Sequence, residues 1–316
     1  MVEAFLRSGC VNCKQHHDCL VAPWRARWVV GVCKLKSFHQ VIVVESVRVS
    51  YVFNIPYHGN DKLKQVMDKV RENKRLHTYW KCSNVMAIER MGYTDHGPTH
   101  VKIVANIALN LLRVLVRRGL IKPSIVQNYG LTNDDAEVVV VLGSILHDLG
   151  MIVQRRDHER YSATFALQVL DDLLTPTYTE EERAIITSEV LHAIVTHEQP
   201  PSTEPTNKIM TKEAGIVGIA DALDMEAGRA RIPFQSGKID IHAVSALSIE
   251  KVEIEQTDNA PKPITIRIQM SNSAGVFQIG ELLKPRILKS GLEQFFHVIA
   301  EITGEKETRI IEKFEI

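Results

Sequence analysis

The chain has 316 residues, of which 45% are hydrophobic and 24% are charged, and its formal net charge is zero. This composition is typical of a globular protein, and the balanced charge gives no general attraction to nucleic acid or to a membrane surface. No stretch of 18 apolar residues occurs, and the first residues lack the pattern of a secretory signal, so we predict neither a transmembrane helix nor a signal peptide.

Residues 1–60 differ from the rest of the chain and are predicted to form an N-terminal extension. Four of the five cysteines lie here, at Cys10, Cys13, Cys19 and Cys33. The two-residue spacing between Cys10 and Cys13 could serve a zinc or iron–sulfur site, although the spacings to Cys19 and Cys33 match no zinc ribbon or finger. The alternative is a poorly ordered extension before an internal start such as Met67. Five cysteines in a chain of this length do not suggest a disulfide framework, which favours a reducing cytoplasm as the location.

A partly alternating apolar pattern predicts a strand over Val41–Asn54, before a breaker at 55–60. Residues 61–232 then show helical spacing of apolar residues. We expect Asn133 or Asp134 to cap the third of these helices, and Thr179 to open the fifth through a capping box with Glu182. The predicted helical segments are Lys62–Met91, Pro98–Arg118, Val138–Leu149, His158–Leu174, Thr179–His197 and Thr211–Glu226.

The period changes to two after about Pro233, which predicts a small α+β domain over 233–316. Its expected order is ββαββ, with two hairpins flanking a helix. The predicted elements are Ser248–Gln256, Ile264–Met270, Ile279–Ser290, Phe295–Ile302 and Thr308–Phe314. The fold class is therefore mainly α, a helical bundle over 61–232 followed by the α+β domain.

Metal-ligand residue types recur along the helical block. His147 and Asp148 end the apolar run that begins near Val138, where burial of an imidazole and a carboxylate is costly unless something compensates. Asp221 lies in a second apolar run. Helical bundles build metal sites from such inward-pointing side chains on several helices. The series comprises His96, His100, His147, Asp148, His158, His192, His197, Asp221 and Asp224.

This ordered series resembles the HD-domain superfamily of metal-dependent phosphohydrolases, over about residues 92–230. The resemblance places an HD-type catalytic domain in the helical bundle and implies that His147 and Asp148 lie at its catalytic centre. It implies four ligands to a first metal ion, and two further histidines in subfamilies that bind two ions. In this chain the six positions are His100, His147, Asp148, His158, His197 and Asp221.

The resemblance implies hydrolysis of a phosphomonoester or phosphodiester, with a nucleotide as the expected substrate. One or two divalent ions (Mn, Fe, Co, Zn or Mg) are the expected cofactors, since mixed imidazole and carboxylate ligands suit such ions. With two ions, Asp148 would bridge them. A mononuclear site without His158 and His197 remains open.

Positive side chains near these ligands are candidates to bind phosphate. The candidates for substrate binding are Arg155, Arg156, Arg229 and His96, and further basic candidates are Lys102, Arg160 and Arg231. Arg229 and Arg231 look best placed, because they closely follow the helix of Asp221. His192 should point away from His197, because five residues on a helix place the two on different faces. Asp224 shares a helix face with Asp221 and could orient it.

The main alternative is a regulatory module that binds metal and nucleotide without turnover, in which the C-terminal domain senses a ligand or mediates homodimer formation. A nucleic-acid partner is the least supported, since the later strands lack stacking aromatic residues. The extended His-His-Glu and Gly-Tyr-Pro pattern of cyclic dinucleotide phosphodiesterases is absent. The Glu-Asp pair that follows the His-Asp pair in (p)ppGpp hydrolases is also absent, because Leu149 and Gly150 occupy these positions.

Overall fold

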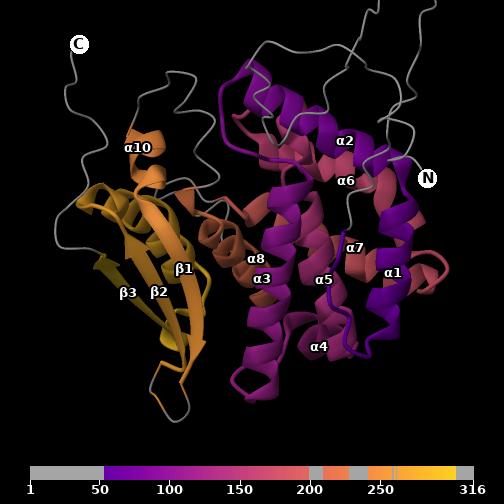
Figure 1. Ribbon diagram of the computed structural model, residues 1–316. Helices are drawn as coiled ribbons and strands as arrows, with labels where there is room; N and C mark the ends of the chain where they lie inside the picture. Colours follow the sequence, from indigo (N-terminus) through magenta and orange to yellow (C-terminus); the bar gives the residue numbers. More distant parts are fainter. Residues whose placement is uncertain (1–52, 199–208, 228–240, 258–259, 261, 304–316) are drawn as a thin grey trace, which may run out of the picture. The chain divides into compact units, whose positions relative to one another are not determined.

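The computed structural model describes residues 53–198, 209–227, 241–257, 260 and 262–303 (Figure 1). They belong to one compact unit that spans Tyr51–Ile316. The cysteine segment, the predicted strand at Thr308–Phe314 and the predicted domain boundary at 232 lie outside these residues. Most of the strand predicted at Val41–Asn54 also does, but its last two residues are described and are not in a strand.

A bundle of helices forms the larger part of the described chain, and α3 and α5 lie at its centre (Figure 1). The central α5 packs against α3, α7 and α8, which explains why its sequence is apolar on every side. The helices of the bundle are α1 (Asp61–Glu72), α2 (Lys74–Asn84), α3 (Pro98–Arg117), α4 (Ser124–Tyr129), α5 (Asn133–Leu146), α6 (His158–Leu174), α7 (Glu180–Thr196) and α8 (Lys212–Leu223).

The core extends to the residues before α1. Phe53 stacks on Trp80 of α2 with ring centroids 5.0 Å apart, and Ile55 is fully buried. The indole N–H of Trp80 donates to the carbonyl oxygen of Ile145 on α5. The described end of the predicted strand therefore packs into the helical core instead of pairing with a sheet.

Among the described helices, α3 has the length and mean hydropathy of a membrane span. Its apolar residues recur at helical spacing, and Val104, Ala108 and Leu112 are buried against neighbouring helices. This packing accounts for its apolar composition, because a central bundle helix is enclosed on most sides.

Local hydrogen bonds set the ends of the helices. The capping box predicted at Thr179 and Glu182 is present. The start of α5 differs from the prediction, because Thr132 forms the capping box with Asp135. Asn73 divides the first predicted helix into α1 and α2, since its side chain accepts the N–H of Leu76 and begins a new helix. A π-helical segment, Val85–Arg90, follows α2.

A three-stranded sheet with helices forms the C-terminal part, in the strand order β1-β2-β3 (Figure 1). The predicted first hairpin is confirmed, with β1 antiparallel to β2. β3 pairs parallel with β2, which requires the intervening helical segment as a crossover. The sequence did not predict α10. The elements are α10 (Ile241–Leu247), β1 (Ile249–Gln256), β2 (Ile264–Met270), α11 (Val276–Gln278), a π-helical turn (Ile279–Leu283), α12 (Lys284–Lys289) and β3 (Phe296–Ile302).

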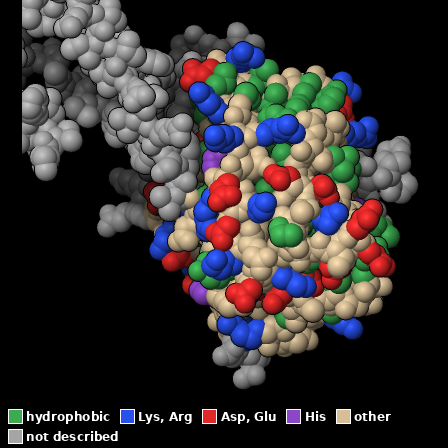
Figure 2. Space-filling model, turned by 90° about the vertical axis from the view of Figure 1, so that its right-hand side faces the viewer, with side chains coloured by type: hydrophobic (Ala, Val, Ile, Leu, Met, Phe, Trp, Pro, Cys, Tyr) green, Lys and Arg blue, Asp and Glu red, His purple; other side chains and the backbone are tan. Residues whose placement is uncertain are grey.

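The face of the molecule in Figure 2 carries basic and acidic side chains interspersed with one another. On this face no continuous basic area is visible, of the kind that binds a nucleic-acid backbone. The mixed pattern agrees with the net charge of zero.

Two carboxyl groups lie buried between α7 and the start of α8. Glu213 accepts the backbone N–H groups of Ser124 and Ile125, which begin α4. Glu189 is 6% exposed, and its Oε2 has no hydrogen-bond partner among the described residues. Burial, and then the charge of Glu213, raise the pKa of Glu189 to about 7 from 4.5.

This buried acid predicts a pH dependence of stability that Glu189→Gln removes. Below pH 4.5 the Glu189 carboxyl is protonated in both the folded and the unfolded protein. Between pH 4.5 and 7 it has lost its proton in the unfolded chain but keeps it in the folded protein. Unfolding therefore becomes easier as pH rises through this window, by about 3 kcal/mol in total. Urea unfolding of both proteins between pH 4 and 8 measures the difference. The exposed Glu181→Gln on the same helix is the control, and parallel curves for wild type and Glu189→Gln would contradict the assignment.

Candidate metal centre

Ends of five helices meet at one point in the bundle and bring the six predicted ligand residues together. Three helix C-terminal ends contribute, and the partial negative charge of such ends favours a cation. The positions are the first turn of α3 (His100), the C-cap of α5 (His147), the residue after it (Asp148), the first residue of α6 (His158), the C-cap of α7 (His197) and the last turn of α8 (Asp221).

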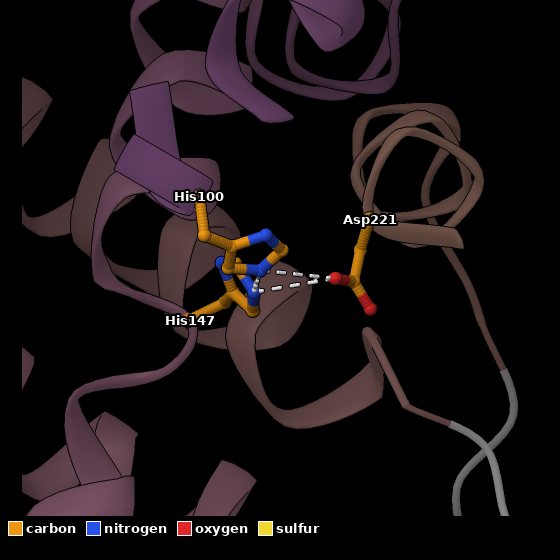
Figure 3. A group of neighbouring side chains, drawn as sticks. All are labelled: His100, His147 and Asp221. Atoms are coloured by element: carbon orange, nitrogen blue, oxygen red, sulfur yellow. Dashed lines mark hydrogen bonds and ion pairs between the residues drawn. The ribbon is translucent and has the colours of Figure 1, made fainter. Parts of the chain in front are cut away.

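The first cluster consists of His100, His147, Asp148 and Asp221; Figure 3 shows His100, His147 and Asp221. The two imidazole Nε2 atoms, of His100 and His147, are 3.2 Å apart. Oδ2 of Asp148 lies 3.2 Å from Nε2 of His100 and 3.1 Å from Nε2 of His147. Oδ1 of Asp221 lies 3.3 and 3.6 Å from the same two nitrogens. All four side chains thus direct one atom each to a common point.

The second cluster uses the other oxygen of Asp148. Its Oδ1 lies 3.1 Å from Nε2 of His158 and 3.8 Å from Nε2 of His197. The two histidine nitrogens are 3.2 Å apart. Asp148 therefore stands between the clusters, with one oxygen directed to each.

Hydrogen bonds on the far side of the rings fix which nitrogen carries the proton. Nδ1 of His147 donates to the carbonyl oxygen of Ser144 at 2.6 Å, and Nδ1 of His197 donates to that of Ile194 at 2.7 Å. Nδ1 of His100 lies 2.6 Å from Oδ2 of Asp224. Because carbonyl and carboxylate oxygens only accept, these three rings carry their proton on Nδ1 when neutral, and Nε2 presents a lone pair to the clusters.

A cation resolves the repulsion that this arrangement creates. Lone pairs of two imidazoles and two carboxylates converge in a largely buried site, which is unfavourable without a positive charge between them. A tetrahedral ion with bonds of about 2.1 Å places its ligand atoms about 3.4 Å apart. The separations in the first cluster, from 3.1 to 3.6 Å, bracket that value. The residues present therefore fit a divalent metal ion.

Gly150 brings the second cluster within reach of Asp148. The 3₁₀ turn Leu149–Ile152 packs directly on the first turn of α6, where a Cβ on Gly150 would overlap the carbonyl oxygen of His158. The N–H of Gly150 donates to Oγ of Ser162 at 2.7 Å. A larger residue would force His158 away from Asp148.

The electrostatics of the site favour positive charge beside the carboxylates. Burial raises the pKa of Asp148 and Asp221, but the neighbouring histidines hold both pKa values well below the ordinary range. Burial lowers the pKa of His147, yet the Asp148 carboxylate raises it to about 9. Burial and two neighbouring histidines lower the pKa of His197 to about 3. His197 is therefore neutral near pH 7, as a metal ligand must be.

The predicted substrate-binding residues lie in different surroundings. Arg155 forms a two-point ion pair with Glu198, beside His158. The Arg156 side chain is 91% exposed and points to solvent. His96 is buried, with its ring centroid 5.8 Å from that of His100. Arg229 and Arg231 lie outside the described residues.

His192 points away from the clusters, as predicted, and its Nε2 accepts the N–H of Met210. Of the remaining basic candidates, Arg160 is exposed and Lys102 is half-buried.

Three further residues at the site were not identified as site residues from the sequence, or were given another role. The carboxylate of Asp224 contacts Nδ1 of His100. Glu198 lies beside His158 and forms a third possible ligand group with it and His197. Arg286, from α12, reaches Asp221. The HD motifs carry no signal for Arg286, because it lies 65 residues after its partner.

Comparison with known proteins agrees with this geometry. The family model of the HD domain matches residues 97–226, which include all six residues of the two clusters. An uncharacterized protein of Methanocaldococcus jannaschii is 42% identical over 253 residues, which are 80% of this chain and 93% of that protein. The similarity thus extends beyond the HD span.

Asp224 is expected to strengthen metal binding through His100. A carboxylate on the outer nitrogen of a metal-bound histidine fixes the ring and increases its basicity, so its loss typically weakens metal affinity by about 10–100-fold. We expect Asp224→Ala to show this loss in a competition titration of Mn²⁺ or Zn²⁺ against a chromophoric chelator. Asp172→Ala, on the exposed side of α6, is the matched control. An unchanged dissociation constant in Asp224→Ala would show that Asp224 has no such role.

Proposed function

The chain belongs to the HD-domain superfamily of metal-dependent phosphohydrolases, and on this premise we propose that it hydrolyses a phosphomonoester or phosphodiester. The observation that carries the proposal is the position of Asp148, whose two oxygens face two separate groups of histidines. This is the arrangement of a carboxylate that bridges two cations.

We propose that His100, His147, Asp148 and Asp221 hold one divalent ion, and that Asp148, His158 and His197 hold a second. Bound ions would supply Lewis acidity toward phosphate oxygens and lower the pKa of a water molecule toward neutrality. Mixed nitrogen and oxygen ligands suit Mn, Fe, Co or Zn, and Mg less well.

The protein's own residues orient the ligands. His147 and His197 cannot turn without losing their Nδ1 hydrogen bonds to the preceding helical turns. The Arg155–Glu198 pair holds His158 from its outer side. His96 lies close enough to the first cluster to contact a substrate there. The family resemblance supports a nucleotide as the substrate.

We expect hydrolysis of bis-p-nitrophenyl phosphate in the presence of a divalent metal. His147→Ala and Asp148→Ala should each lower the rate by at least about 100-fold, because each removes a ligand that positions the reacting groups. His192→Ala is the matched control, since this histidine lies on α7 but faces away from the clusters. Release of p-nitrophenol is the measurement, with circular dichroism to confirm folding.

A different result would identify the alternative function. A wild-type protein that binds metal but releases no p-nitrophenol with any divalent ion, and no phosphate from a panel of nucleotides, would be a binding module without turnover.

The number of bound ions provides a separate prediction. We expect two metal ions per chain after dialysis against Mn²⁺, measured by mass spectrometry of the metal. His158→Ala should retain one ion, because the first cluster does not use this residue. Asp148→Ala should bind fewer ions than either the wild type or His158→Ala. A wild-type value of one ion per chain would establish a mononuclear site and exclude His158 and His197 as ligands.

A further inference from the structure

A buried arginine from the C-terminal part of the chain reaches the first cluster. Arg286 lies on α12, outside the span matched by the HD model, and is 6% exposed. Its Nη2 lies 3.4 Å from Oδ2 of Asp221. Because Oδ1 of Asp221 faces the two histidines, the guanidinium lies on the outer side of this carboxylate.

The guanidinium has few partners for a buried charge. An arginine offers five N–H donors, and a buried charge is costly unless these are satisfied. Among the described residues, its hydrogen bond is the long contact with Asp221, and the buried Nε has no partner. The site therefore has spare donors and a positive charge on the outer side of Asp221.

Close packing of two helices holds Arg286 in this place. Gly215 and Gly218 lie one turn apart on α8, on the side that faces α12. A Cβ at Gly215 would come within 2.8 Å of the carbonyl oxygen of Ser290, just after α12. A Cβ at Gly218 would lie 3.1 Å from the carbonyl oxygen of His197 and in ordinary contact, at 3.6 Å, with Cδ of Arg286. The absence of a side chain at Gly215 lets α12 approach α8, and the arginine stem passes beside Gly218.

We propose that Arg286 binds the phosphate of the substrate, so that the C-terminal segment completes the active site of the HD domain. The inference rests on the proposed function, because it assigns the anion that such a site would receive. A phosphate oxygen can accept two N–H groups of a guanidinium in a planar arrangement, which would satisfy donors that the protein leaves unused.

The alternative role, in which Arg286 only positions Asp221, makes an opposite prediction for metal affinity. A guanidinium beside a divalent ion repels it, so removal of the charge leaves metal binding unchanged or tighter if Arg286 serves the phosphate. If Arg286 serves to orient Asp221, its removal weakens metal binding by about 10–100-fold.

The experiment measures the binding of inorganic phosphate and of Mn²⁺ by calorimetry, in full-length wild type, Arg286→Gln and Arg286→Lys. We expect Arg286→Gln to weaken phosphate binding to the Mn²⁺-loaded protein by about 10–100-fold, the effect of losing a charge-assisted hydrogen bond. The phosphate affinity of Arg286→Lys should lie between those of wild type and Arg286→Gln, because lysine keeps the charge but lacks the planar guanidinium. Lys284→Gln, an exposed lysine on the same helix, is the control.

The outcomes separate the two proposals. Equal phosphate affinity in wild type and Arg286→Gln, or weaker Mn²⁺ binding in the variant, would overturn the role of Arg286. If Arg286→Gln fails to fold, the comparison of Arg286→Lys with Lys284→Gln decides the same question. A wild-type protein that binds Mn²⁺ but neither binds phosphate nor hydrolyses phosphate esters would instead contradict the proposed function.

Discussion

The structure depends on one constraint, the convergence of acceptor atoms in a largely buried site. Asp148 and Asp221 each place an oxygen 3.1–3.6 Å from Nε2 of His100 and His147, which brackets the spacing of ligand atoms around a divalent ion. Such a cluster is unfavourable in isolation and favourable around a cation. The energy of metal binding would therefore also stabilise the bundle, because the ligands come from the ends of separate helices.

Many features of the bundle serve this convergence. The histidines of α5 and α7 follow the last helical turn, where their Nδ1 atoms can reach a carbonyl oxygen three residues earlier. The same position lets the chain turn after His147 and present Asp148 between the clusters. The second cluster is the looser of the two, since His197 lies 3.8 Å from Asp148. This difference gives a physical reason to expect the first ion to bind more tightly.

The sequence was sufficient for much of the bundle and for the residues that converge in it. An apolar run that ends in His147 and Asp148 can only be buried, and helical spacing placed α3, α6 and α7 within a few residues of their observed bounds. Helix breaks were less predictable, because Asn73 and Thr132 act through single side-chain hydrogen bonds that compete with other caps nearby. The parallel pairing of β3 with β2 was missed, since an alternating pattern does not determine strand direction.

Arg286 shows most clearly what a sequence pattern cannot supply. Its position depends on contact between α8 and α12, which Gly215 permits and which no local sequence pattern predicts. The HD span contains the six residues of the two clusters but not this arginine. The similarity to the archaeal protein also extends beyond that span. A buried guanidinium with spare donors, held beside a ligand carboxylate by the segment after the HD span, makes this C-terminal segment part of the site instead of an appended domain. The substrate would then bind where the two parts meet, and its phosphate would join them.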